Sequence, residues 1–64
     1  MAHSNRKSTV KLVKGDRIAL ADDRFVVVDR VQLMPYGMAR IWHGHLGLQH
    51  TDAGRRYTWK VVPA

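Results

Sequence analysis

Cysteine and glutamate are both absent from this chain of 64 residues. Without cysteine, disulfides and thiolate zinc sites are excluded, although sites built from histidine and aspartate stay open. A chain this short buries only about 60% of the surface that its unfolded form exposes, so its core is small and its stability is marginal. We therefore expect one domain, for which self-association is a route to extra stability.

Long apolar runs are also lacking. No stretch approaches the roughly 20 apolar residues that cross a bilayer, and the first nine residues have no apolar centre of a signal peptide. Both absences predict a cytoplasmic protein without a membrane partner. Residues 1–9 are polar and without periodicity, which predicts a flexible basic tail, followed by one domain over 10–64.

Catalytic signatures are missing as well. The chain has no glycine-rich phosphate loop and no nucleophile elbow, and its two serines, Ser4 and Ser8, lie in the expected tail. Asp22 and Asp23 are adjacent carboxylates, but Arg24 follows them in a turn-like segment, which favours a solvated turn. We therefore expect no enzymatic activity and no cofactor.

Positive charge is what the chain has in excess. The net charge is +6, from eleven lysines and arginines against five aspartates. An excess of this sign favours an anionic partner, such as nucleic acid, an acidic protein or an anionic membrane surface. From Gly37 onward only Asp52 opposes the cations, so the basic footprint is expected in the C-terminal half, with the tail as an auxiliary arm.

Valine, aromatic and turn residues alternate in the rhythm of a small all-β fold. The pattern predicts a turn over residues 51–54 and no long helix. The expected strands are residues 10–13, 17–20, 25–34, 38–45 and 55–62.

Residues 25–28 are apolar on both faces of the expected strand. One interpretation is a β-bulge near Asp29 and Arg30, which would reset the alternation. The other is a strand covered on its outer side by a partner, which predicts a homodimer. The residues expected at that dimer contact are Phe25, Val26, Val27 and Val28.

The same alternation predicts a core. On the strand over 38–45, Ala39, Ile41 and His43 share one face, while Arg40 and Trp42 share the other. Trp59 is expected in the core, and for Trp42 both a buried and an exposed position stay open. The expected core residues are Leu12, Ile18, Leu20, Val26, Val28, Val31, Ile41, Tyr57, Trp59 and Val61.

The segment Leu12-Val-Lys-Gly-Asp-Arg-Ile-Ala-Leu20 resembles the opening of SH3-like barrels, including the KOW-type modules of ribosomal and transcription proteins. In those proteins an apolar residue, a Gly-Asp turn and an alternating strand begin the barrel. After Leu20 the chain departs from the KOW pattern, with Ala21-Asp22-Asp23 where that motif has its glycine. The resemblance implies an all-β, SH3-like barrel of four or five antiparallel strands that binds nucleic acid or protein.

Basic and aromatic residues combine in the C-terminal half. Arg56, Thr58 and Lys60 are expected on one strand face, where their donors would contact phosphates. Arg40 and Trp42 share a neighbouring face, where an exposed indole could stack on an unpaired base. The predicted nucleic-acid-binding residues are Arg6, Lys7, Lys11, Arg40, Trp42, Arg55, Arg56 and Lys60.

His43 and His45 stand at alternate positions, so both imidazoles could reach one divalent metal ion, with His50 or Asp52 completing the set. Two histidines at a strand end are a weak signal, and we predict no metal site.

These features together predict a small nucleic-acid-binding module that contacts mainly the phosphate backbone of DNA or RNA. The alternative is a non-enzymatic protein-interaction module, such as a phage or plasmid accessory protein that docks on a larger host factor through residues 25–28. A third reading is a structural subunit that works by self-association. Salt dependence separates the first two, since phosphate binding weakens steeply as salt rises.

Overall fold

The computed structural model describes residues 5–21 and 23–62, so residues 1–4 of the expected tail and Asp22 lie outside it. The described residues form six β-strands and two single-turn 3-10 helices. In chain order these are β1 (Arg6–Ser8), η1 (Thr9–Lys11), β2 (Arg17–Ala21), β3 (Arg24–Leu33), β4 (Met38–His43), η2 (His45–Gly47), β5 (Gln49–Gly54) and β6 (Thr58–Val62). None of the helices in this part of the chain is long and apolar enough to cross a membrane.

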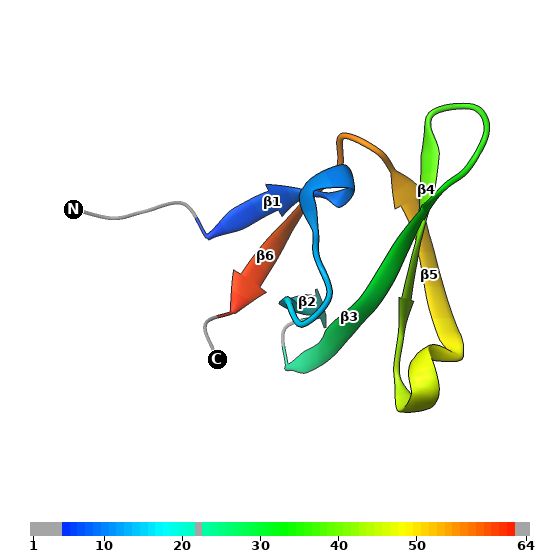
Figure 1. Ribbon diagram of the computed structural model, residues 1–64. Helices are drawn as coiled ribbons and strands as arrows, with labels where there is room; N and C mark the ends of the chain where they lie inside the picture. Colours follow the sequence, from blue (N-terminus) through cyan, green and yellow to red (C-terminus); the bar gives the residue numbers. More distant parts are fainter. Residues whose placement is uncertain (1–4, 22, 63–64) are drawn as a thin grey trace.

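All strands join one antiparallel sheet in the order β1-β6-β2-β3-β4-β5. The predicted all-β class is confirmed. The sheet ends at β1 on one side and β5 on the other and has six strands, so it is not a closed barrel of four or five. Figure 1 shows β3 running diagonally between two groups of strands, β1, β6 and β2 on one side and β4 and β5 on the other.

The segment before Leu12 differs from its prediction. Within the expected tail, β1 pairs with β6, placing Arg6 opposite Lys60. The strand expected over residues 10–13 is replaced by the turn of η1. The Thr9 N–H donates to the carbonyl of Tyr57 at 2.9 Å, and the Leu12 N–H turns back to the Thr9 carbonyl at 3.2 Å. These bonds turn the chain back on itself, whereas a strand would require extended backbone that pairs with a neighbouring strand.

A β-bulge in β3 lies where the alternation breaks. Val28 pairs with His43 and Arg30 with Trp42, so the register shifts across Asp29. The bulge predicted near Asp29 and Arg30 is thus confirmed. The β4–β5 turn packs directly on it, because a Cβ added to Gly47 would meet the Asp29 carboxyl carbon at 2.7 Å.

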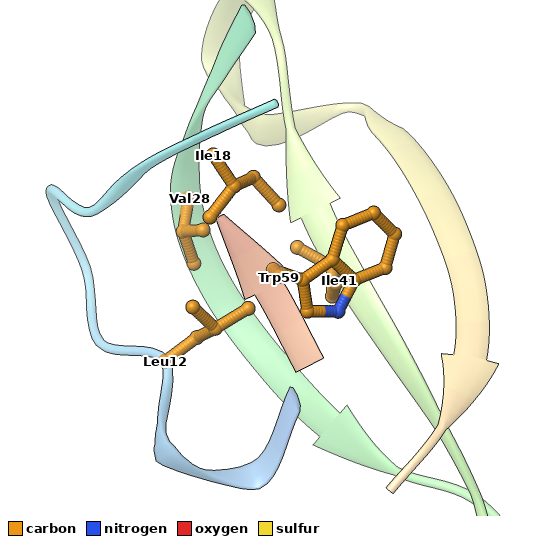
Figure 2. Close-up of a cluster of buried hydrophobic side chains, with 5 residues drawn as sticks. All are labelled: Leu12, Ile18, Val28, Ile41 and Trp59. Atoms are coloured by element: carbon orange, nitrogen blue, oxygen red, sulfur yellow. The ribbon is translucent and has the colours of Figure 1, made fainter. Parts of the chain in front are cut away.

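The core lies between the two groups of strands, as Figure 2 shows. Its buried apolar cluster has one residue that directly follows η1 and one residue from each of four strands, and all five members were predicted. They are Leu12, Ile18, Val28, Ile41 and Trp59. The predicted Leu20, Val26, Val31 and Val61 are partly buried against this cluster. The placement of Tyr57 in the core is wrong: its side chain is 55% exposed, because β6 begins only at Thr58.

The turn predicted over residues 51–54 is also wrong, since these residues belong to β5. Aspartate and glycine are poor strand formers, but β5 pairs with β4 along its whole length, for example Thr51 with Ile41. Tertiary pairing therefore overrides local preference. The turn lies instead at Arg55 and Arg56, so these two residues precede the last strand and are not part of it.

A buried polar contact fixes the last strand against the first turn. The Trp59 indole Nε1–H donates to the Thr9 hydroxyl at 2.9 Å, and that hydroxyl donates to the Tyr57 carbonyl at 3.2 Å. Trp59 is 8% exposed and Thr9 is fully buried. Trp59 therefore supplies both apolar area and a satisfied hydrogen bond, while the Tyr57 ring packs edge-on against it, with centroids 4.8 Å apart.

We expect Trp59→Ala to lower the free energy of unfolding by about 3–5 kcal/mol, the usual scale for a buried aromatic side chain. The matched control is Tyr57→Ala, which removes an exposed ring and the aromatic pair, worth about 0.5–1.5 kcal/mol beyond its buried area. Urea unfolding measures both. Equal losses for the two variants would contradict the placement of Trp59 in the core and Tyr57 outside it.

Candidate nucleic-acid interface

The outer face of β3, β4 and β5 carries two cross-strand rows of polar and aromatic side chains. Residues directly opposite one another on antiparallel strands share a face. In one row Trp42 lies between Arg30 and His50, and in the other Arg40 lies between Gln32 and Asp52. The alternation predicted for β4 is confirmed, because Ala39, Ile41 and His43 are buried on the opposite face.

Trp42 is the centre of this face. The Arg30 guanidinium carbon lies 4.8 Å from its ring centroid, and that of Arg40 lies 5.8 Å away. Its Nε1–H donates to the Gln32 side-chain oxygen at 3.1 Å, and the His50 ring packs at 5.1 Å. The indole is half-buried among polar neighbours and does not belong to the core. A cation over an aromatic ring is attracted to the ring by its quadrupole, so each arginine is held against Trp42 on an open sheet face.

Arg40 is less available to bind a phosphate than its sequence position predicts. Its Nε and a terminal nitrogen donate to the two Asp52 carboxylate oxygens at 2.7 and 3.1 Å. The hydrogen bond to Asp52 raises the pKa of Arg40, and in return the bond from Arg40 lowers the pKa of Asp52. The pair is neutral as a unit. Among the described residues no carboxylate pairs with Arg30, the other cation on this face. The sequence interpretation did not select Arg30, because only the bulge turns it outward.

Arg55 and Arg56 lie at the end of the same group of strands, beside the β3–β4 turn. The Arg55 backbone N–H donates to the Gly37 carbonyl at 2.9 Å. Its guanidinium donates to the carbonyls of Met34 at 2.6 Å and Met38 at 3.2 Å. Carbonyls are neutral, so Arg55 keeps its charge in a fixed place, while Arg56 is exposed.

Arg6 and Lys60 lie on a second surface, in the other group of strands. Beyond Ile18 and Val61 the strands β2 and β6 no longer pair, and a hollow of about 270 Å³ opens between them. Arg6, Lys60, Phe25 and Tyr57 are among its lining residues. Arg6 donates to the hydroxyl and the carbonyl of Thr58 at 3.1 and 2.8 Å, so it too is held by neutral acceptors.

Lys7 and Lys11 join neither surface. The Lys7 ammonium lies 3.1 Å from Asp16, whose carboxylate also accepts the Val13 N–H at 3.0 Å. Burial opposes ionisation of Asp16, but the bonds from Val13 and Lys7 outweigh it and lower its pKa. Lys7 is thus a structural partner of the turn before β2. Lys11 is exposed on η1.

The predicted dimer contact is divided between two faces. Val28 and Val26 point inward, fully and partly buried, whereas Phe25 and Val27 are 46% and 53% exposed. The two-sided apolar run thus has one side in the protein's own core. Only Phe25 and Val27 are left as surface residues for a partner.

The two histidines considered for a metal do not meet. His43 ends β4 on the buried face, and after Gly44 the chain turns so that His45 is exposed in η2. The described residues contain no group of three histidine, aspartate, glutamate or cysteine side chains that could hold a metal ion. His43 instead shares a 2.9 Å hydrogen bond between its Nε2 and the Thr51 hydroxyl.

Comparison with protein-family models, with curated proteins and with solved structures finds no match for this chain. Inferences about its function therefore rest on the residues and geometry described above.

His43 is expected to make the fold sensitive to acid. Burial lowers the pKa of His43, assisted by the charges of Arg24 and His50. The unfolded chain, whose histidines titrate near about 6.5, thus binds this proton more readily than the folded chain. The stability contributed by neutral His43 is complete above that pH and is lost as the pH falls below it.

We therefore expect the melting temperature to drop as the pH is lowered from about 7.5 to about 5.5, across the ordinary histidine range. His43→Gln should reduce this drop, whereas the control His45→Gln, at an exposed position, should keep it. Thermal unfolding measures the effect, and an NMR titration of the parent imidazole reports its pKa directly. A His43 that titrates at or above 6.5 would contradict the argument.

Proposed function

We propose that this chain is a small nucleic-acid-binding module without enzymatic activity that contacts mainly the phosphate backbone. The observation that carries the proposal is Trp42 on the open face of β3, β4 and β5, flanked by Arg30 and Arg40. Single-stranded nucleic acid is bound in general by aromatic rings on which bases stack and by cations along the phosphates. An arginine plane lying over an aromatic ring offers its own outer side to a base.

The distribution of charge supports the same partner. Arg30 lies beside Trp42, and Arg55 lies on the β3–β4 turn at the end of the same strands. The net charge of the chain is +6. Arg6 and Lys60 add a second basic surface around the hollow. Positive potential of this extent attracts polyanions and raises their association rate.

We also propose that the domain is SH3-like. Strands β2 to β5 pair in succession, and β6 returns to pair with β2, which supports this architecture beyond the resemblance at Leu12–Leu20. Folds of this kind serve both nucleic-acid and protein partners, so the choice between partners rests on the surface chemistry.

A protein-interaction module is the second candidate. The observation that favours it is the exposed pair Phe25 and Val27 on the outer face of β3, which would provide an apolar docking edge for a larger protein or for a second copy of the chain. An apolar contact of this kind depends little on salt. Affinity for a protein partner, or self-association, that is unchanged between low and high salt would therefore favour this candidate.

The test is a binding titration against single- and double-stranded DNA and RNA of one sequence at about 50 and 200 mM salt. We expect binding that weakens as salt rises. Removing two cations with Arg30→Ala and Arg56→Ala should flatten the salt slope by about 0.7 per lost contact on single strands and about 0.9 on duplex. The fold should survive, since exposed substitutions usually cost within about 0.5 kcal/mol.

The matched control is Lys14→Ala with Arg17→Ala, which removes the same charge from the turn before β2 and from the start of β2, outside both surfaces. Trp42→Phe should retain most of the affinity, because its ring still stacks. No binding of any of the four nucleic acids at low salt would overturn the proposal. If the Lys14→Ala, Arg17→Ala control lost as much affinity as the Arg30→Ala, Arg56→Ala variant, the outer face of β3, β4 and β5 would be excluded as the binding surface.

A further inference from the structure

The β3–β4 turn holds a tyrosine in a conformation that tyrosine disfavours. Tyr36 and Gly37 are the two central residues of the turn, with φ of 63° and 73°. A positive φ at both positions defines the hairpin turn that Asn-Gly fills best. For Gly37 this conformation has no steric cost, but for a residue with a Cβ the left-handed region is unfavourable. Asparagine at position 36 would adopt this conformation at a lower cost in folding free energy.

Nothing in the fold accounts for the tyrosine. Its side chain is fully exposed, and no side-chain hydrogen bond or ring contact among the described residues involves it. The turn is held by its backbone: the Met34 N–H donates to the Met38 carbonyl at 2.9 Å, and the Met38 N–H donates to the Pro35 carbonyl at 3.3 Å. Residues kept in disfavoured conformations cluster at functional sites, where the surroundings enforce them.

Arg55 adds rigidity and charge to this turn. Its backbone bonds to Gly37, and its guanidinium bonds to the Met34 and Met38 carbonyls, as described above. The turn is therefore clamped from the β5–β6 side, and Figure 1 shows it projecting beyond the strands. Arg55 therefore holds one positive charge on the backbone of this turn, and the exposed Arg56 follows it in the chain. A ring at the tip of a clamped hairpin loses little freedom when it binds, which favours affinity.

We propose that Tyr36 is a stacking residue for an unpaired base of single-stranded nucleic acid, with Arg55 and Arg56 on the adjacent phosphates. Charge complementarity favours this occupant over a neutral apolar partner, because Arg55 holds a positive charge on the turn itself. Single strands are favoured over duplex, since only unpaired bases offer a free face to a projecting ring. This inference rests on the proposed function and specifies which form of nucleic acid the module prefers.

The decisive variant is Tyr36→Asn, because folding and binding then predict opposite effects. Asparagine accepts the left-handed region more readily than tyrosine, so the melting temperature should rise, by up to about 16 °C if the whole left-handed cost is removed in a domain of this size. Affinity for a single-stranded oligonucleotide should nevertheless fall about 5- to 150-fold, the range that corresponds to losing one stacked base. A lower affinity in a more stable protein cannot be ascribed to unfolding.

Two comparisons complete the test. Tyr36→Trp keeps a stacking ring with the same strain, so it should keep the parent's affinity within about twofold and not raise the melting temperature. Binding to duplex of the same sequence should change little in either variant. Equal losses for single strand and duplex in Tyr36→Asn, or an affinity for single strands equal to the parent's, would overturn the inference.

The outcome is separable from that of the proposed function. If the parent chain binds no nucleic acid at low salt, both the proposed function and the role of Tyr36 are refuted. If the parent binds and loses affinity on removal of Arg30 and Arg56, but Tyr36→Asn binds as tightly as the parent, only the role of Tyr36 is refuted.

Discussion

The buried bond from the Trp59 indole to the Thr9 hydroxyl is the contact on which the rest of the structure depends. A chain of this length has a small core, and Trp59 is its largest member, so an indole N–H without a partner there would be costly. The Thr9 hydroxyl accepts this N–H and donates in turn to the Tyr57 carbonyl. These two bonds hold the N-terminal segment against β6. That attachment places Leu12 in the core and sets Arg6 opposite Lys60. One hydrogen-bonded pair thus fixes both the core and the basic hollow.

The bulge at Asp29 has the corresponding role for the other surface. Under simple alternation, Arg30 would share the inner face with Val28. The extra residue instead turns Arg30 outward, opposite Trp42, and returns Val31 to the core opposite Ile41. Bulges commonly re-aim side chains beside functional surfaces. Here the close approach of Gly47 to the Asp29 carboxyl group keeps the bulge covered, since any side chain at position 47 would collide with it.

Local alternation was enough to predict what depends on one strand alone. It placed Ile41 and His43 on one face of β4, opposite Trp42, and it offered the bulge beside Arg30 as one of two interpretations. It failed where the outcome depends on pairing between distant segments. β5 is a strand only because β4 lies beside it, and Asp52 neutralises Arg40 only through that register. The same holds for β1, whose polar residues pair with β6, and for Tyr57, which precedes a strand that begins one residue later.

Four of the cations that sequence selected have polar partners of two kinds, and the difference is physical. Arg40 and Lys7 face carboxylates, so a phosphate would have to compete with Asp52 or Asp16 for them. Arg55 and Arg6 donate to carbonyl and hydroxyl oxygens, which fix the guanidinium without cancelling its charge. A cation already held in place loses less side-chain entropy when an anion arrives, and its field is reduced only by solvent and salt. Net charge alone does not separate these kinds. The effective basic surface is therefore set by which acceptor each arginine meets in the fold, and at Arg55 that acceptor belongs to the same turn that presents Tyr36.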